Sequence, residues 1–254
     1  MGCRPTSRQF ESVILLIMDK SSFLYWYPKI VGSLETPRSV IIPFSTQDAV
    51  KILSGNEVAL SDLVYMVISE LRKNHISFPV FFKTDFYSAK WYWADTCLIN
   101  SKNDLEKNIL SLLSLNQADD CRPVNALIFK QYIQPETKLS AFNGMPIGKE
   151  RRYFIEDKRV LCHHPYWEEN SIEFFNEDYP EDWRDILRDL NVEDAPEVET
   201  LTRYSELFAR LIEDDGYFSV DFMQGIAGNW YVIDCAEGHK SYHNEDCPVF
   251  LNKQ

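Results

Sequence analysis

Two short apolar and aromatic segments near the C-terminal end of the chain constrain its fold more than any other feature. Residues 217–223 and 229–234 flank the turn sequence Gly225-Ile-Ala-Gly228, and this arrangement predicts a β-hairpin. The turn of a hairpin sets its register, so it also fixes which residues of the two strands face one another. The two segments therefore predict antiparallel sheet and place specific side chains opposite each other.

The predicted register brings two carboxylates together. With the tip at Ala227-Gly228, Asp221 faces Asp234 on the neighbouring strand, about 5 Å away, where like charges repel. The rest of both strands is apolar or aromatic, so partial burial would raise the cost of the two charges. A hard divalent cation such as Mg²⁺ would convert this cost into a binding site, with Glu237 as a further ligand. The alternative is a shifted register that leaves both aspartates in solvent.

A second hairpin is predicted over residues 151–164, with its turn at the polar pair Asp157-Lys158. Alternate residues of a strand share a face, so Glu150 and Arg152 point together and Arg151 points away. Arg152 could bind a phosphate through two parallel hydrogen bonds, with Glu150 orienting it. An exposed ion pair between strands is the alternative.

Lys83 stands at the end of the apolar residues 78–82, in a segment that predicts a strand. A lysine held by an apolar strand is a fixed positive charge for a phosphate. The loop of residues 84–90 follows directly, and its Lys90 could close over further phosphates. The alternative is a lysine at a strand end that extends into water.

The remaining periodicity predicts an α+β chain rather than the alternation of strand and helix typical of a doubly wound fold. We expect residues 1–74 to form a small strand-rich lead-in with apolar runs at 13–18 and 39–44 and one amphipathic helix. Residues 75–135 are expected to form one α+β unit. Its predicted elements are a strand at 79–84, a helix over 105–113 capped by Asn103, and a strand at 126–133.

Residues 136–254 are expected to form a second α+β unit that contains both hairpins and an acidic insertion, 168–199. Within the insertion the pattern predicts a short helix over 182–190 and a break at Pro196. A longer amphipathic helix is predicted to begin at Thr200 and to be closed by Gly216.

The net charge of −13 excludes a general binder of nucleic acid or of anionic membranes, because phosphate backbones require a basic face. The charge is concentrated in one place. Residues 168–199 hold 13 Asp and Glu against two Lys and Arg, a net −11, whereas residues 79–161 hold 12 Lys and Arg against 10 Asp and Glu, a net +2. An anionic ligand is therefore expected in the central block. The acidic insertion is either a solvated segment or a rim that selects a basic amine.

The six cysteines are scattered, and the first residues lack the pattern of a signal peptide, so we expect reduced thiols and a cytoplasmic location. The apolar run 13–18 is too short to span a membrane and predicts a buried strand. Cys235, His239, His243 and Cys247 recur every four residues, which suggests zinc. The suggestion is weak, because four ligands on one short stretch cannot easily surround a tetrahedral ion.

Taken in chain order, these segments resemble the ATP-grasp superfamily over roughly residues 20–245. The resemblance rests on Lys83, the loop Ser88-Ala-Lys-Trp91, the segment Leu127–Tyr132, Glu150-Arg-Arg152, Val220-Asp-Phe222 and Ile233-Asp234. Tyr25–Lys29 and Ser39–Pro43 are similar to eukaryotic cell-division-cycle ATP-grasp proteins that assist assembly of translation initiation factor 2. Residues 141–147, 164–167 and 234–243 are similar to a clade of phage and bacterial ATP-grasp proteins whose substrates are unknown.

The resemblance implies a fold in which two α+β units with antiparallel sheets sandwich ATP. It implies that Lys83 and Lys90 hold the α- and β-phosphates, that Arg152 stabilises the transferred phosphoryl group, and that Asp221 and Asp234 ligate Mg²⁺. Adenine would be bound by the backbone of Phe129, Lys130, Gln131 and Tyr132.

The chemistry implied by the resemblance is ligation of a carboxylate to an amine, with the carboxylate activated as an acylphosphate; a peptide or protein is one class of substrate. This fits a chain without a GxSxG, P-loop, GxGxxG or HExxH motif. One departure concerns the metal: Ala236 stands where the assembly-factor branch has Asn. Either Glu237 replaces that ligand or the metal shell is thinner. The alternative function is therefore a non-enzymatic, ATP-binding assembly factor.

Overall fold

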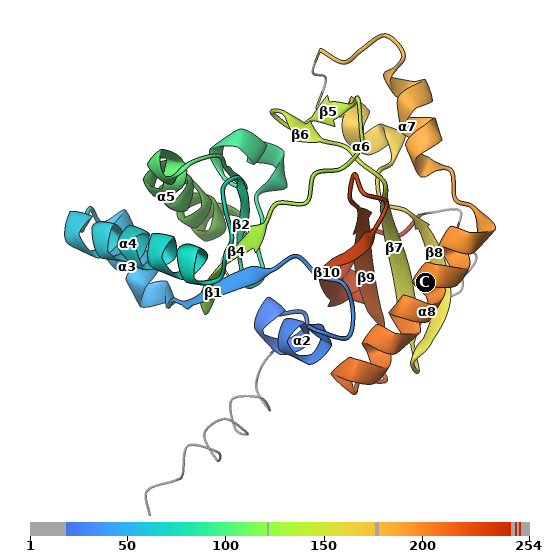
Figure 1. Cartoon of the computed structure of the whole chain (residues 1–254), viewed down its shortest axis with the longest axis horizontal. Helices are drawn as coiled ribbons and strands as arrows, with labels where there is room; N and C mark the ends of the chain where they lie inside the picture. Colours follow the sequence, from blue (N-terminus) through green and yellow to red (C-terminus); the bar gives the residue numbers. More distant parts are fainter. Residues whose placement is uncertain (1–18, 121, 176–177, 245–246, 248, 250–254) are drawn as a thin grey trace, which may run out of the picture.

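The computed structural model describes residues 19–120, 122–175, 178–244, 247 and 249 (Figure 1). Its α-helices are α2 (Phe23–Ile30), α3 (Thr46–Leu53), α4 (Glu57–Lys73), α5 (Leu105–Leu115), α6 (Glu169–Glu173), α7 (Trp183–Asn191) and α8 (Ala195–Ile212). Shorter helical turns are η1 (Lys90–Asp95), η2 (Lys102–Asp104), η3 (Asn116–Asp120) and η4 (Gly238–Lys240). In the described part of the chain, every helix is too short or too polar to cross a membrane.

The strands form two four-stranded antiparallel sheets and one small ribbon. The first sheet has the order β1-β4-β2-β3, the second β10-β9-β7-β8, and the ribbon consists of β5 and β6. The strand bounds are β1 (Ser39–Pro43), β2 (Val80–Thr84), β3 (Leu98–Ile99), β4 (Ala126–Gln131), β5 (Ser140–Ala141), β6 (Met145–Pro146), β7 (Glu150–Glu156), β8 (Arg159–Pro165), β9 (Phe218–Gln224) and β10 (Trp230–Glu237). The predicted α+β fold class with antiparallel sheets is confirmed.

Helices α3, α4 and α5 cover the outer face of the first sheet (Figure 1). Strand alternation divides the residues of β2 and β4 between the two faces. Val80 and Phe82 of β2, with Leu127 and Phe129 of β4, are buried under these helices. The residues that alternate with them along the strands, including Lys83, therefore face the second sheet.

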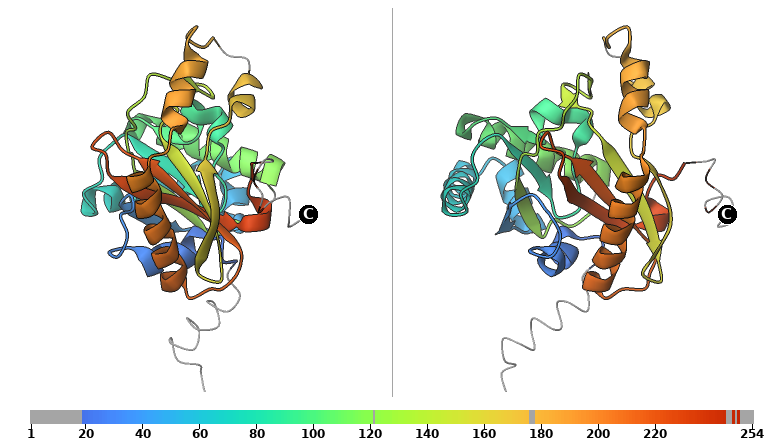
Figure 2. Two further views of the ribbon diagram at one scale, coloured as in Figure 1. Left: turned by 90° about the vertical axis from the view of Figure 1, so that its right-hand side faces the viewer. Right: turned by 45° about the vertical axis from the view of Figure 1, so that its right-hand side comes forward.

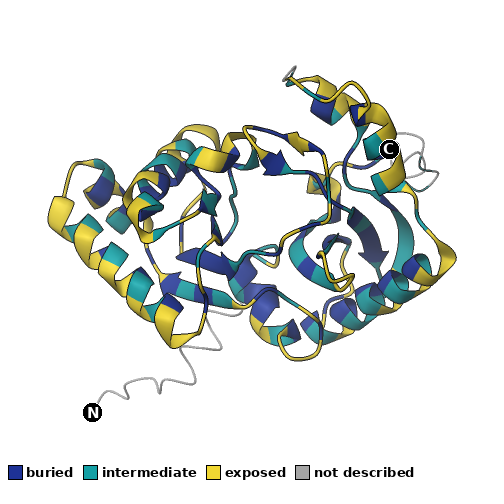
Figure 3. Cartoon of the chain, turned by 45° about the horizontal axis from the view of Figure 1, so that its top comes forward, coloured by how far each residue is buried: buried dark blue, intermediate teal, exposed yellow. Residues whose placement is uncertain are grey.

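Helix α8 packs along β7 and β8 on the side of the second sheet that is turned away from the first (Figure 2). The apolar residues of this face, among them Tyr153, Val220 and Phe222, are buried with Phe208 of α8 in a second core that also includes α2. Figure 3 shows the same division, since the outward faces of the covering helices are exposed and the strands beneath them are buried. Arg152 of β7, Asp221 of β9 and Asp234 of β10, which pair across the sheet, are thus left on its inner face.

A third core joins the acidic segment to the ribbon above the two sheets (Figure 1). Trp93 of η1, Phe142 and Met145 pack with Ile172 of α6 and Trp183 of α7. The predicted helix over 182–190 is confirmed by α7. The acidic insertion is therefore attached to the body of the protein by apolar side chains, while most of its charged residues lie on its surface; Glu197 is buried.

Several predicted details differ from the structure. In the described part of the lead-in, residues 19–57 form two helices and one strand rather than a strand-rich segment, because aromatic residues of α2 are anchored in the second core. The strand β1 pairs with β4 and so completes the first sheet. The strand predicted at 13–18 lies outside the described residues. Asn103 does not cap α5: it lies within η2, which Ser101 caps, and Asp104 precedes α5.

The long helix α8 begins five residues before the predicted Thr200. Asp194 caps it by accepting a hydrogen bond from the Glu197 backbone N–H at 2.8 Å, and Pro196 lies in the first turn. Proline is favoured there because the first N–H groups of a helix have no partner within the helix. The prediction of a break at Pro196 is therefore wrong. The helix ends at Ile212, followed by Glu213 in the left-handed conformation, rather than at Gly216.

Candidate functional site

Asp221 and Asp234 face each other on β9 and β10, as the sequence predicts, but the register that achieves this is not uniform. Near the tip Val232 pairs with Phe222, one residue away from the predicted pairing. An irregularity between Val232 and Asp234 then adds one residue to β10 and restores the predicted pairing at the aspartates. The extra residue is Ile233, and such a β-bulge redirects the strand locally.

The two aspartates belong to a row of polar residues across the inner face of the second sheet. His164 on β8 pairs with Arg152 on β7, Arg152 pairs with Asp221, and Asp221 pairs with Asp234. The Arg152 guanidinium donates from Nε and Nη2 to the two oxygens of Asp221, each at 2.8 Å. The predicted common face of Glu150 and Arg152 is confirmed, since both lie on this side and Arg151 lies on the other.

Lys83 reaches this row from the first sheet. Its Nζ lies 3.0 Å from Oδ1 of Asp234, and the lysine side chain is only 3% exposed. Burial by itself raises the pKa of Asp234, but Lys83, Lys130 and Lys90 outweigh burial and hold the pKa below its usual value. The carboxylate is therefore charged, and it interacts with three lysines that come from β2, β4 and η1.

Lys130 on β4 makes a second connection between the sheets. Its Nζ donates to the backbone oxygen of Ile233 at 2.7 Å, so the bulge in β10 supplies the acceptor. Burial, with help from the positive charge of Lys83 and Lys90, lowers the pKa of Lys130 to about 7, although Asp234 opposes the shift. Lys130 can thus gain or lose a proton near neutral pH.

Lys90 and Glu150 complete the charged groups. Lys90 Nζ lies 4.8 Å from the centre of the Tyr166 ring. Burial lowers the pKa of Lys90, but Tyr166 and three nearby carboxylates outweigh burial and raise the pKa above its usual value, so the ammonium is retained. The carboxylates are those of Glu150, Asp234 and Asp221. Glu150 is 2% exposed, and its Oε2 has no hydrogen-bond partner among the described residues. Burial raises the pKa of Glu150, an effect that Lys90 opposes.

Five of these charged residues line a pocket of about 70 Å³ between the two sheets, whereas Arg152 and Asp221 are outside its lining. Its apolar and aromatic lining is formed by Phe81, Trp93, Tyr132, Ile133, Met145, Met223 and Ile233. Its charged lining residues are Lys83, Lys90, Lys130, Glu150 and Asp234. The pocket therefore combines apolar and charged side chains.

The structure does not bring every predicted residue to this pocket. Glu237 is three residues beyond Asp234, so strand alternation turns it to the other face, where it pairs with Lys240 at 2.6 Å and with His239 at 3.2 Å. Phe129 is stacked on Phe82 in the first core. Lys130, Gln131 and Tyr132 do line the pocket, and the Gln131 side chain also accepts a hydrogen bond from Arg38.

Sequence reasoning missed the side chain of Lys130 and assigned only its backbone. A signal was present, because Lys130 alternates with the apolar residues of β4 and must share the face opposite to Phe129. The bulge at Ile233, which gives Lys130 its acceptor, had no such signal.

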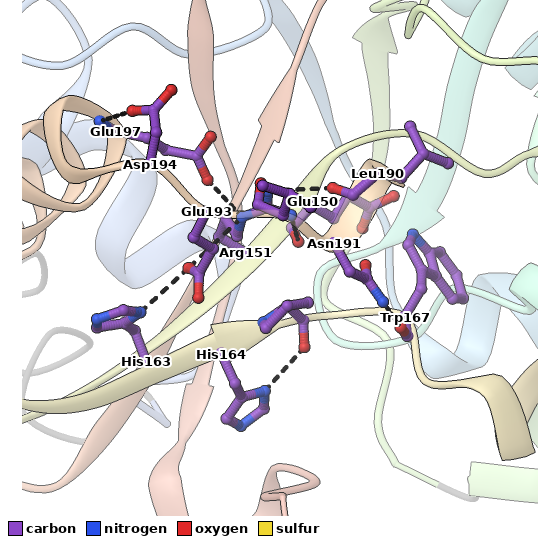
Figure 4. A network of polar contacts seen from close by, with 12 residues as sticks. Glu150, Arg151, His163, His164, Trp167, Leu190, Asn191, Glu193, Asp194 and Glu197 are labelled. Carbon is purple, nitrogen blue, oxygen red and sulfur yellow. Dashed lines mark hydrogen bonds and ion pairs between the residues drawn. The ribbon is translucent and has the colours of Figure 1, made fainter. Parts of the chain in front are cut away.

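Arg151, on the outer face of the sheet, anchors the end of the acidic segment (Figure 4). The side chain is fully buried; its Nε donates to Glu197 and its Nη2 donates to the backbone oxygens of Leu190 and Val192 at 3.1 and 2.9 Å. Because Arg152 is the next residue on β7, this network also fixes the strand that carries the site arginine.

Comparison with known proteins agrees with this architecture. The sequence model of the ATP-grasp domain, R-two-K clade family 3, matches residues 71–247. Among solved structures, C-terminally truncated Cdc123 from Schizosaccharomyces pombe is similar with a TM-score of 0.54 and 14% identity, over 93% of this chain and 87% of that chain. At this identity the likeness concerns the fold alone.

Two ligase structures are more distant in geometry. The ATP-grasp ligase PsnB, complexed with a minimal precursor, has a TM-score of 0.46 and 13% identity over 86% of this chain. D-alanine–D-alanine ligase from Bacillus anthracis, complexed with ATP, has a TM-score of 0.47 and 14% identity, also over 86% of this chain. The chain spans about half the length of these two, 52% and 55% respectively. No curated protein sequence matches.

Proposed function

The chain belongs to family 3 of the R-two-K clade of ATP-grasp domains, and from this premise we propose that it binds ATP with Mg²⁺ between its two sheets and uses it to join a carboxylate to an amine. The observation that carries the proposal is the lining of the pocket, in which lysines of the first sheet meet carboxylates of the second beside apolar and aromatic side chains. ATP likewise combines an apolar base with a polyphosphate.

The apolar and aromatic lining residues of the pocket are suited to adenine. Phe81, Tyr132 and Met223 come from both sheets and offer flat or adaptable surfaces to a purine ring. The chain leaves β4 at Gln131, so the backbone that follows can bind the edge of the base. This extends the sequence-based assignment of residues 129–132, with the Phe129 side chain serving the core instead.

The charged residues of the pocket are suited to phosphates. Lys83, Lys90 and Lys130 reach it from β2, from η1 and from β4. Arg152, which is paired with Asp221 on the second sheet, would add a guanidinium. We assign Lys83, Lys90 and Lys130 to the polyphosphate, and Arg152 to the phosphoryl group that is transferred. Positive groups fixed in advance around a developing negative charge are the main source of catalysis in phosphoryl transfer.

The donor set fits Mg²⁺. Asp221 and Asp234 pair across the two strands and present carboxylate oxygens side by side, which is the ligand chemistry that Mg²⁺ prefers. When bound, the metal would neutralise charge on the phosphates. Both aspartates are now paired with Arg152 and Lys83, so we propose that these cations turn to the phosphates when the aspartates take the metal.

A second hollow suits an amine substrate. It is about 380 Å³ and is lined by Pro165, Trp167, Glu168, Glu169, Asn170, Asn191, Tyr242 and Asn244. Arg152 donates to the backbone oxygen of Tyr242 at 3.2 Å, so this hollow adjoins the site arginine. Its acidic residues would favour a basic amine, including one on a peptide. Glu169→Gln is expected to weaken binding of the amine substrate and to leave ATP binding unchanged.

Thermal unfolding with and without ATP and Mg²⁺ tests nucleotide binding. We expect the ligands to raise the melting temperature of the wild type, and Lys83→Ala, or Asp221→Ala with Asp234→Ala, to abolish this rise. Lys138→Ala, at an exposed position outside the pocket, is the matched control. An undiminished rise in the site variants would reject the site assignment.

Release of ADP tests ligase activity. A screen of carboxylates and amines should find a pair for which ADP release requires both, and Arg152→Ala should abolish that release while ATP still binds. Binding without turnover throughout the screen would reject the ligase and favour the second candidate, a non-enzymatic ATP-binding assembly factor. One observation favours that candidate. Glu237 is paired with Lys240, and the Ala236 side chain has no atom that could bind a metal. On β9 and β10, the carboxylates that could bind the metal are therefore those of Asp221 and Asp234.

A further inference from the structure

A cluster of two cysteines and one histidine lies outside the nucleotide pocket. Cys162 is on β8, and His243 and Cys247 are on the segment that follows η4. The two sulfur atoms and a ring nitrogen of His243 all lie within 4.8 Å of one another. The cluster shares only two residues with the four-residue repeat in the sequence, because Cys235 is buried in the second core and His239 is exposed beside Glu237.

We propose that Cys162, His243 and Cys247 bind a soft divalent transition metal, with Zn²⁺ as the expected ion. Two thiolates and an imidazole are a ligand set that zinc takes up in proteins, and three protein ligands leave one position of a tetrahedron for water. The proposal concerns a site distinct from the one assigned to Mg²⁺, whose ligands are carboxylates.

The distances are close to those that a metal requires. Cys162 Sγ lies 3.2 Å from His243 Nε2. In a tetrahedral zinc site with Zn–S of about 2.3 Å and Zn–N of about 2.1 Å, sulfur and nitrogen ligands are about 3.6 Å apart. The pair therefore needs to separate by only a few tenths of an ångström to admit the ion.

The histidine is held in the orientation that metal binding needs. Its Nδ1 lies 3.3 Å from the backbone oxygen of Asn244, so a proton on Nδ1 donates there and leaves the Nε2 lone pair directed at Cys162. A hydrogen bond from the other ring nitrogen to a carbonyl is the usual support of a metal-bound histidine. The ring is 4% exposed and stacks on Phe154, with 4.0 Å between the ring centres.

Both thiols of the cluster are accessible. Cys162 and Cys247 are partly exposed, so an ion can reach them. Binding would release the two thiol protons to solvent, so affinity should rise with pH.

The metal would fix the segment that contacts the proposed catalytic arginine. Cys162 pairs across the sheet with Phe154, two residues beyond Arg152 on the same face of β7. Tyr242, next to His243, accepts the hydrogen bond from Arg152. A bound metal would thus tie the chain around Tyr242 to β8. The effect of the metal on the site of Arg152 rests on the proposed function, but the binding of the metal does not.

Cobalt titration of the full, tag-free chain tests the site. The protein is kept reduced and stripped with a chelator, and Co²⁺ is then added. We expect one equivalent to produce thiolate-to-cobalt charge-transfer absorption and the strong visible bands of tetrahedral cobalt, and Zn²⁺ to remove them. Cys162→Ser, Cys247→Ser and His243→Asn should each weaken Co²⁺ binding by more than about 100-fold. Substitution of a residue that only hydrogen-bonds to a metal ligand typically costs about 10–100-fold.

His239→Asn is the matched control, because this histidine belongs to the same segment and is exposed; it should bind Co²⁺ as the wild type does. Alkylation followed by mass spectrometry provides a measurement on the unaltered chain, in which Zn²⁺ should protect Cys162 and Cys247. Absence of the cobalt bands in the wild type, or binding by the two serine variants equal to that of the wild type, would overturn the proposal. Formation of a Cys162–Cys247 disulfide by a chain that binds no metal when reduced would also overturn it, in favour of a redox pair.

Discussion

Lys83 and Asp234 belong to different sheets, and the 3.0 Å contact between Lys83 Nζ and Asp234 Oδ1 joins those sheets in the wall of the pocket. Asp221 is paired in the same way with Arg152. Each proposed metal ligand therefore carries a cation that could instead bind phosphate. Nucleotide and metal would together exchange these partners, so the two halves of each pair should respond differently to substitution.

Lys83→Met is expected to weaken ATP binding about 10–100-fold both with and without Mg²⁺, because it removes a hydrogen bond from a charged donor worth about 1.5–3 kcal/mol. Asp234→Asn should bind metal-free ATP at least as well as the wild type, since Lys83 is released, but should lose the gain in affinity that Mg²⁺ gives. Isothermal titration calorimetry with and without Mg²⁺ measures both. The reverse outcome, a Mg²⁺ effect lost in Lys83→Met and kept in Asp234→Asn, would contradict the assignment.

Lys130 predicts uptake of a proton when ATP binds. Its pKa is lowered to about 7, first by burial and then by Lys83 and Lys90, so at pH 8 the group is mainly neutral. Phosphates beside it would raise this pKa, so that the complex takes up protons above pH 7. Below pH 6 the group is already charged and uptake should vanish. Calorimetry in buffers with different heats of ionisation measures the number of protons.

Lys130→Met should remove this uptake, and Lys138→Met, at an exposed position, should keep it. The same shift affects stability. The folded-state pKa lies below the unfolded value of about 10.4, so folding releases a proton between these values and the free energy of unfolding rises with pH in that window. The difference in stability between wild type and Lys130→Met should follow this trend. Equal proton uptake by Lys130→Met would show that another group titrates.

Local patterns in the sequence were sufficient for the fold class and for much of the site. Turn residues and apolar spacing predicted both hairpins, and the family resemblance is confirmed by the match over residues 71–247. The pairing of Asp221 with Asp234 was correct even though the tip register was not, because the bulge at Ile233 compensates for the one-residue difference.

Features that depend on distant parts of the chain could not be predicted. A bulge has no residue signature here, so the acceptor of Lys130 was not visible in the sequence. Cys162 is about 80 residues from His243, and only the folding of the second sheet brings them together. The burial of Glu150 results from the meeting of several segments. Local periodicity records which face a residue occupies, but it does not record which segment covers that face.

Gly148 is expected to be sensitive to substitution because two segments of the chain pack closely at this position. A Cβ at this position would lie 2.4 Å from Cβ of Pro135, which lines the pocket. Gly148→Ala should therefore lower the free energy of unfolding by about 1–3 kcal/mol, as overpacking does, measured by urea denaturation. The cost should shrink when Pro135→Gly is also present, because the clashing atom is then gone. An undiminished cost in the double variant would show that close approach is not the cause.

The network around Arg151 predicts a large loss of stability from a single change outside the pocket. Arg151 is fully buried, and its main ionic partner is Glu197, which is 8% exposed. Arg151→Met leaves that carboxylate buried without its cation and should cost about 3–5 kcal/mol, the range found for broken buried ion pairs. Adding Glu197→Gln should recover part of the loss, because the uncompensated charge disappears. Arg188→Met, which breaks an exposed pair with Asp185, should have little effect by comparison. Urea denaturation of the two single variants at 151 and 197, their double variant and the Arg188 control measures the coupling between Arg151 and Glu197, and strictly additive losses would show that the two side chains stabilise the protein independently.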